Sequence, residues 1–321
     1  MRADAVGVRA LLATLAMTAG GPAVAFEPVL TFTRYDEDIV YIARPHHGTG
    51  QVTLVEVDLA ASLPKNVYTS VSPDRPTAVD ISSTSLVYTL PRGRLEFLEL
   101  GPNPLATTLP LVGDATTRCA VNTPGNRAIL QYANRLETMD VEINAMTWPL
   151  ELAEQGTVTA LGASEFRLFV GFSTGRVLVY DLEYGRLLDK FDRDTAVTAF
   201  ASQRDGLLVV GYAAGNVLGW NLENHGLAWE QTVTGEGPVS HLAVADVESQ
   251  LAVSRSAAPP YIYHASLGTV VGQLKVSGTQ TVRAVTVGRM GRIGVLWSDQ
   301  FLTIHDGESL VTSDRVYIPN F

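Results

Sequence analysis

The sequence predicts an all-β chain folded as a seven-bladed β-propeller of four-stranded antiparallel blades. Three observations support this prediction. A unit of about 41 residues recurs along the chain, three strand signatures keep the same phase within each unit, and no long amphipathic helical pattern follows the N-terminal segment. Short strands separated by turn residues at a fixed period are typical of propellers.

The first 25 residues have the layout of a secretory signal peptide. Arg2 and Arg9 precede a short apolar stretch, which the small-residue triplet Ala23-Val24-Ala25 follows. The apolar stretch is too short to cross about 30 Å of hydrocarbon. We therefore expect cleavage after Ala25, a periplasmic or secreted protein, and a single propeller domain over residues 26–321.

Composition excludes several classes of protein. The formal net charge is −10, so the chain repels nucleic acid and anionic lipid. Cys119 is the only cysteine, which excludes an internal disulfide framework and Cys-x-x-Cys-His haem attachment. No later segment is apolar for long enough to span a membrane. The sequence therefore predicts a soluble, acidic and monomeric propeller without a bound cofactor.

The repeat is clearest in its two central copies. The segment Gly175-Arg176-Val177-Leu178-Val179-Tyr180-Asp181-Leu182-Glu183 recurs 40 residues later as Gly215-Asn216-Val217-Leu218-Gly219-Trp220-Asn221-Leu222-Glu223. Each copy follows an apolar run, residues 168–172 and 207–212. Two short strands joined by a glycine turn indicate a β-hairpin.

One position of the repeat, which we call the repeat anchor, can be followed through all seven units. Spacings between successive anchors lie between 40 and 43 residues. An apolar or aromatic residue precedes six of the seven, and we expect it to lie between blades, with the anchor ending the third strand beside a turn. The anchors are Asp58, Glu99, Asp140, Asp181, Asn221, His264 and Asp306.

Turn residues lie six positions before four of the anchors. They are Gly93, Asn134, Gly175 and Gly215, which tolerate a positive φ. The other three units place Gly50, Pro259-Pro260 and Asp299 in this region.

A second signature marks the innermost strand of each blade. Segments 158–161, 197–200, 239–242 and 282–285 share one pattern, and 79–81 and 119–121 are weaker copies. A four-stranded sheet of about 40 residues cannot bury both faces alone, whereas radial stacking covers each face with a neighbour and closure removes exposed edges. We expect contiguous blades, with residues 29–58 opening the first and 310–318 forming the outer strand of the last.

Two segments resemble known propeller families. Residues 175–186, GRVLVYDLEYGR, resemble the third-strand motif of WD40 repeats, with Tyr180-Asp181 in place of Trp-Asp. Residues 221–229 are similar to the tryptophan-docking motif of quinoprotein repeats. The resemblance extends over nearly the whole mature chain, is strongest over residues 157–230, and implies an exported bacterial member of the WD40 and quinoprotein-like propellers.

The inner strands supply the candidate ligand-binding residues. His241 stands where the equivalent positions are alanines, and Arg283 and Asp80 lie on other inner strands. Because inner strands line the central channel, these three residues are predicted to approach one another and hold an anion or a small polar ligand. The alternative is a solvated channel wall with mutually compensated charges.

Other functional signals are weak. The six histidines form no His-x-His or His-Glu-x-x-His motif, and no Gly-x-Ser-x-Gly, Walker or dinucleotide motif occurs. We expect His264 and His305 to have packing or turn roles. Trp148, Trp229 and Tyr184 are candidate partner contacts, or packing residues of their blades.

These observations lead to two functional hypotheses. The first is a non-enzymatic periplasmic propeller that binds an unknown protein partner, as a scaffold or accessory subunit of a respiratory or envelope assembly. The rival is a propeller that binds a small ligand or redox cofactor, quinoprotein-like or d1-haem-like, over the channel mouth near His241 and Arg283. Both rest on analogy of fold.

Overall fold

The structure is a computed structural model that describes residues 27–32, 38–46, 49–101, 104, 106–111, 116–122, 124–133, 135–152, 155–203, 206–245, 249–255, 258–275, 280–288 and 291–319. The expected signal peptide, residues 1–25, lies outside the described residues. No helix in the described part of the chain has the length and apolar character needed to span a membrane.

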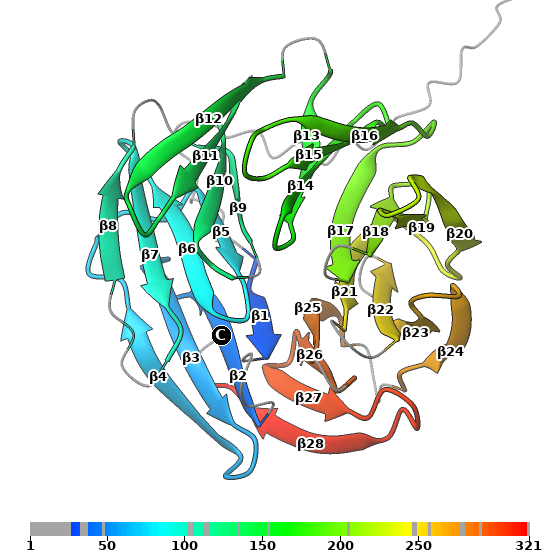
Figure 1. Cartoon of the computed structure of the whole chain (residues 1–321). Helices are drawn as coiled ribbons and strands as arrows, with labels where there is room; N and C mark the ends of the chain where they lie inside the picture. Colours follow the sequence, from blue (N-terminus) through cyan, green and yellow to red (C-terminus); the bar gives the residue numbers. More distant parts are fainter. Residues whose placement is uncertain are drawn as a thin grey trace, which may run out of the picture.

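Seven four-stranded antiparallel sheets stand side by side in a ring, which confirms the predicted seven-bladed propeller (Figure 1). Blade 1 contains β1 (Val29–Phe32), β2 (Ile39–Pro45), β3 (Val52–Asp58) and β4 (Leu63–Thr69). Blade 2 contains β5 (Ala78–Ile81), β6 (Ser85–Leu90), β7 (Arg94–Glu99) and β8 (Ala106–Pro110). Blade 3 contains β9 (Arg118–Val121), β10 (Arg127–Gln131), β11 (Arg135–Asp140) and β12 (Ala145–Glu151). Blade 4 contains β13 (Val158–Ala163), β14 (Arg167–Phe172), β15 (Val177–Asp181) and β16 (Leu187–Phe191).

The last three blades repeat this order. Blade 5 contains β17 (Val197–Gln203), β18 (Leu207–Tyr212), β19 (Asn216–Asn221) and β20 (Gly226–Thr232). Blade 6 contains β21 (Val239–Val244), β22 (Gln250–Arg255), β23 (Tyr261–His264) and β24 (Thr269–Gln273). Blade 7 contains β25 (Val282–Val287), β26 (Ile293–Trp297), β27 (Phe301–His305) and β28 (Thr312–Tyr317). The first strand of every blade lies at the centre of the ring, as the inner-strand signature predicted (Figure 1).

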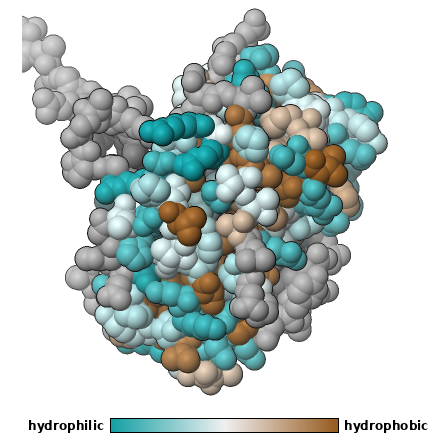
Figure 2. Space-filling view, turned by 90° about the vertical axis from the view of Figure 1, so that its left-hand side faces the viewer, coloured by the Kyte–Doolittle hydropathy of each residue, from teal (hydrophilic) through white to brown (hydrophobic). Residues whose placement is uncertain are grey.

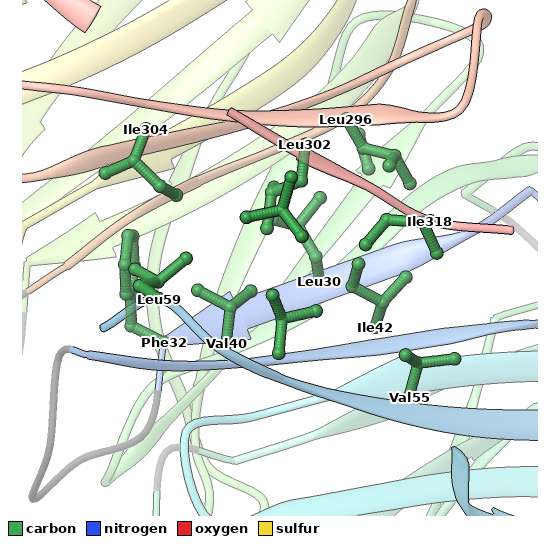
Figure 3. Close-up of a cluster of buried hydrophobic side chains, with 13 residues drawn as sticks. Leu30, Phe32, Val40, Ile42, Val55, Leu59, Leu296, Leu302, Ile304 and Ile318 are labelled. Atoms are coloured by element: carbon green, nitrogen blue, oxygen red, sulfur yellow. The ribbon is translucent and has the colours of Figure 1, made fainter. Parts of the chain in front are cut away.

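The ring closes by side-chain packing and not by a shared blade. β1 belongs to blade 1 and β28 to blade 7, so each blade is one contiguous segment, as predicted. Figure 3 shows Leu30, Val40 and Ile42 of blade 1 facing Leu302 and Ile318 of blade 7. Each side chain of this size contributes about 1.5–3 kcal/mol when fully buried. Burial across this interface therefore joins the two ends of the propeller.

The apolar or aromatic residue that precedes six of the seven anchors lies between blades, as expected. Val57, Leu98, Met139, Tyr180 and Tyr263 are all buried. Trp220 is only half-buried, and its ring stacks on Phe191 of blade 4 with centroids 4.2 Å apart. On the outside, Figure 2 shows hydrophobic residues interspersed among hydrophilic ones over the side of the ring where β4 and β8 lie.

The structure explains why four of the anchors are Asp or Asn. The Oδ1 atom of Asp181 accepts hydrogen bonds from the backbone N–H groups of Glu183, at 3.0 Å, and Tyr184, at 2.8 Å. Asp140, Asn221 and Asp306 accept the same pair of bonds in their own blades. The anchor side chain thus satisfies two backbone donors that the tight turn leaves without strand partners.

A second feature of this turn has no simple sequence signature. The residue four positions after the anchor has a positive φ in every blade where the structure describes it. These residues are Ser62, Asn144, Gly185, His225, Gly268 and Leu310, with φ between 51° and 68°. Only two of the six are glycine, so residue type alone does not reveal the position.

In the turn between the second and third strands, Gly93, Gly175 and Gly215 have a positive φ as predicted. In blade 7 the residue with a positive φ in this turn is Gln300 and not the expected Asp299. Asn134 lies outside the described residues.

We expect Asp181→Ala to lower the free energy of unfolding by about 1 kcal/mol, because two turn N–H groups lose their acceptor. Asp181→Asn keeps the accepting oxygen, as Asn221 does in blade 5, and should change stability by less than about 0.5 kcal/mol. Urea denaturation of the two variants beside the wild type measures this difference. Equal losses in both variants would show that the charge, and not the acceptor, stabilises the turn.

Tryptophans on outer strands join two pairs of neighbouring blades. Trp229 of β20 donates its indole N–H to the carbonyl of Ala265 in blade 6, at 2.7 Å, and its ring fills the space above Gly268. Trp148 of β12 makes the same contact with Leu182 in blade 4, at 3.1 Å, above Gly185. Of the two interpretations of these tryptophans, the structure supports packing. Tyr184 is 60% exposed.

Candidate functional site

The structure places the three predicted channel residues on three blades and brings only two of them into contact. His241, on β21, has its Nε2 atom 3.1 Å from the backbone oxygen of Arg283, on β25. Its Nδ1 atom lies 2.9 Å from the Ser240 hydroxyl. Burial lowers the pKa of His241, so the neutral ring donates through Nε2 to the carbonyl and accepts through Nδ1. The contact with Arg283 therefore involves its backbone and not its charge.

The guanidinium of Arg283 has a partner other than His241. It forms an exposed ion pair with Glu27, just before β1, at 3.1 Å. This pair links blades 7 and 1 at one face of the ring. An exposed pair of this kind contributes at most about 1 kcal/mol.

Asp80 occupies a separate part of the channel. On β5, its Oδ2 atom accepts a hydrogen bond of 2.8 Å from the backbone N–H of Val121, on β9 of the next blade. Burial raises the pKa of Asp80 to about 6, although bonds from the N–H groups of Val121 and Ile81 act in the opposite direction. No contact joins Asp80 to His241 or Arg283 among the described residues.

Arg118 is a channel residue that the sequence pattern did not identify. Its Nε atom donates to the carbonyl of Val158, in the next blade, at 3.4 Å. The surrounding strands desolvate the side chain enough to lower its pKa, although it still reaches channel water. Aligning β9 with the strands that carry Ala160, Ala199 and His241 would have identified it.

Asp80, Arg118 and His241 share one structural role. Each bonds to a backbone group on the inner strand of the following blade. The inner strand is the edge of its sheet, so it has backbone groups without a strand partner, and these side chains satisfy some of them. All three point toward the following blade because they stand at alternate positions of their strands, which share one side of the sheet. This common direction explains why Arg118 does not pair with Asp80.

The two faces of the ring differ in charge. We call the face that carries the loops between strands one and two, and between strands three and four, the acidic face. Its described cations are Arg127, Arg167, Arg186 and Arg292, of which Arg127 pairs with Asp140 and Arg292 with Asp38. Carboxylates outnumber them among the described residues: Asp38, Asp58, Glu99, Asp140, Glu142, Glu165, Asp181, Glu183, Glu223, Asp306 and Glu308. The opposite face is rich in arginine, including Arg75, Arg92, Arg94, Arg176 and Arg193. The repeat anchors produce much of this asymmetry because every blade delivers its anchor to the same face.

A groove opens on the acidic face between blades 2 and 3. Its volume is about 300 Å³, and its lining includes the apolar side chains of Phe97, Leu100 and Val141. Glu99 and Glu142 are the charged residues of the lining that the structure describes, and both are exposed. Ser83, Thr84, Ser85 and Asn126 also line it, so the groove combines apolar and polar side chains with negative charge.

Three exposed apolar side chains lie in turns of the same face, one in blade 3 beside the groove residue Glu142 and two in blade 4. Ile143 is 71% exposed, and Phe166 and Tyr184 are each 60% exposed. Phe166 and Tyr184 lie on adjoining loops, since the N–H of Leu182 donates to the Phe166 carbonyl at 2.8 Å. We call the groove and these three residues the acidic-face patch. Each of the three stands next in sequence to a glutamate: Glu142, Glu165 or Glu183.

In comparisons with known proteins, the chain matches no family model and no curated protein. Among the described residues, no three His, Cys, Asp or Glu side chains gather in a way that would hold a metal ion.

Proposed function

We propose that this chain is a non-enzymatic, exported propeller that binds a protein partner through the acidic-face patch. In this role it is a scaffold or an accessory subunit of a respiratory or envelope assembly. The observation that carries the proposal is the group of exposed apolar side chains beside a groove, each next to a carboxylate. Exposed apolar groups with a polar rim are typical of protein interaction sites.

The chemistry of the patch specifies the partner. Apolar side chains of the partner fill the groove between blades 2 and 3, and neighbouring Lys or Arg side chains pair with Glu142, Glu165 and Glu183. The Tyr184 ring already has one guanidinium over it, that of Arg186, at 4.9 Å from the centroid. Aromatic and arginine side chains contribute strongly to protein interfaces.

A selection from a displayed peptide library tests this specificity. We expect wild-type protein to enrich peptides with an apolar residue flanked by Lys or Arg, and added salt to weaken their binding. The variant Glu142→Lys, Glu165→Lys, Glu183→Lys should bind these peptides at least tenfold more weakly. Enrichment of acidic peptides by the wild type would contradict the proposal.

The natural partner is sought by affinity capture from an envelope extract of the source cells. The patch variant Ile143→Ser, Phe166→Ser, Tyr184→Ser should retain the partner at least tenfold less than the wild type. A matched control replaces three apolar residues exposed elsewhere, Val71, Val270 and Tyr317, with serine. Capture that is equal for both variants, or a visible chromophore in the purified protein, would contradict a patch-based scaffold.

A further inference from the structure

The central channel has one level at which every side chain is either small or polar. In each blade, the residue two positions before the repeat anchor lies on the third strand. The strand pairings align it, through the second strand, with one residue of the inner strand. These seven equivalent residues are Thr31, Asp80, Ala120, Gly162, Ala201, Ala243 and Thr286. Four of them are glycine or alanine, so their side chains leave space near the axis.

Larger apolar residues stand at the levels on either side. The preceding level contains Leu30, Val79, Cys119, Leu161, Phe200, Leu242 and Val285, and the following level is apolar apart from Ser202. A cavity of about 340 Å³ lies at these levels, and residues from all seven blades line it. We call this cavity the axial chamber.

Asp80 is the one charged residue among the described residues that line the axial chamber. Its carboxylate accepts backbone hydrogen bonds, but it forms no ion pair with any described residue. A desolvated carboxylate is costly unless a cation compensates it. The described part of the chamber therefore has a half-buried, desolvated negative charge without a positive partner among the described residues.

We propose that the axial chamber binds a small organic cation, with its ammonium group at Asp80. The alkyl part of the cation lies against apolar walls that include Leu242, Phe200 and Phe32. The Thr31 and Thr286 hydroxyls are available as further acceptors for the ammonium N–H groups. A calcium ion needs six to eight oxygen ligands, which these walls do not supply. An anion is repelled by Asp80.

The location of the chamber favours capture of cations. Its lining extends to Ser83 and Gly288, at the loops of the acidic face. A negative surface raises the local concentration of cations and speeds their association. The chamber is separate from the acidic-face patch, so this site and the proposed protein-binding function can fail independently.

Isothermal titration calorimetry with n-butylammonium chloride tests the site at pH 7.5, with n-butanol and sodium butyrate as neutral and anionic probes of similar size. We expect saturable binding of butylammonium only. Asp80→Asn should weaken it at least tenfold, because the amide keeps an acceptor for the Val121 N–H but loses the charge. Glu183→Gln, which removes one carboxylate from the acidic face, should leave the affinity within twofold.

Two further variants complete the test. Ala243→Leu fills the chamber and should abolish binding, while the patch variant Ile143→Ser, Phe166→Ser, Tyr184→Ser should bind butylammonium as the wild type does. A thermal melt of each variant verifies that it is folded. Binding should weaken at pH 5 as Asp80 gains a proton; of the titratable groups facing it from β9, the Cys119 thiol stays protonated and Arg118 points toward blade 4. The proposal is overturned if no butylammonium binding is detected, or if Asp80→Asn binds it equally well.

Discussion

Trp229→Ala is expected to lower the free energy of unfolding by about 3–5 kcal/mol, the range for removing a large buried aromatic side chain. The indole is buried between two glycines, Gly219 on its own blade and Gly268 on the next. Its removal leaves a cavity between blades 5 and 6 and also removes the hydrogen bond to the Ala265 carbonyl. Urea denaturation at neutral pH measures the loss.

A double-mutant cycle with Gly268→Ala shows whether the ring contact itself carries this energy. An added Cβ at Gly268 would lie 2.5 Å from Cδ2 of Trp229, and the backbone there has a φ of +67°. In the wild type we expect a clash plus backbone strain. In the Trp229→Ala background only the strain of about 1–2 kcal/mol remains. Additive effects would argue against direct packing of this tryptophan on Gly268.

The exposed Tyr184→Ala is a suitable control. It removes a large aromatic side chain that is 60% exposed, so stability should change by no more than about 0.5 kcal/mol. A loss comparable with that of Trp229→Ala would show that size, and not burial between blades, determines the effect.

Asp80 is expected to make the protein less stable as the pH rises from about 4 to about 6. Its pKa is about 6 in the folded chain, against an ordinary value of 3.8 when the chain is unfolded, so the folded state holds the proton over this range while the unfolded state has released it. The free energy of unfolding therefore falls as the pH increases. A shift of this size corresponds to about 3 kcal/mol at pH values above both pKa values.

The measurement is the difference in stability between Asp80→Asn and the wild type as a function of pH. Because the neutral amide has no charge to desolvate, Asp80→Asn should be more stable by about 2–3 kcal/mol at pH 7.5, and the difference should disappear near pH 4. Other carboxylates cancel in this comparison. A difference that does not change with pH would show that burial does not perturb Asp80.

The desolvation free energy of the Asp80 carboxylate also connects the stability of the chain with its proposed ligand. A cation bound beside Asp80 would favour the charged carboxylate and offset part of the desolvation free energy. We therefore expect butylammonium to raise the melting temperature of the wild type at pH 7.5 and to leave that of Asp80→Asn nearly unchanged.

Much of the fold was predictable because each blade repeats the same local requirements. The anchors Asp140, Asp181 and Asn221 accept hydrogen bonds within their own turns, so the residue type is specified locally. The inner strands were recognisable for a similar reason, since a β-branched residue opens most of them. The turn position that contains Ser62 and Leu310 was not predictable, because a positive φ there is imposed on residues that do not prefer it.

The candidate sites were less predictable because they combine residues from different blades. Asp80, His241 and Arg283 were correctly placed on inner strands, but sequence alone did not show that His241 bonds to the Arg283 backbone while Asp80 bonds to Val121. The groove between blades 2 and 3 depends on which loops become neighbours in the ring. Ile143, Phe166 and Tyr184 carry no pattern that distinguishes them from core residues.

The sequence by itself determined the number of blades, their four-stranded pattern and the place of the anchor at the end of the third strand, because these depend on hydrogen bonds and burial within one repeat. Only the tertiary structure decided which side chains meet between blades, including those that pack blade 1 against blade 7, and where the channel widens around Asp80. Those features depend on the radial packing of strands that are about 40 residues or more apart in the chain, and local residue preferences do not encode that packing.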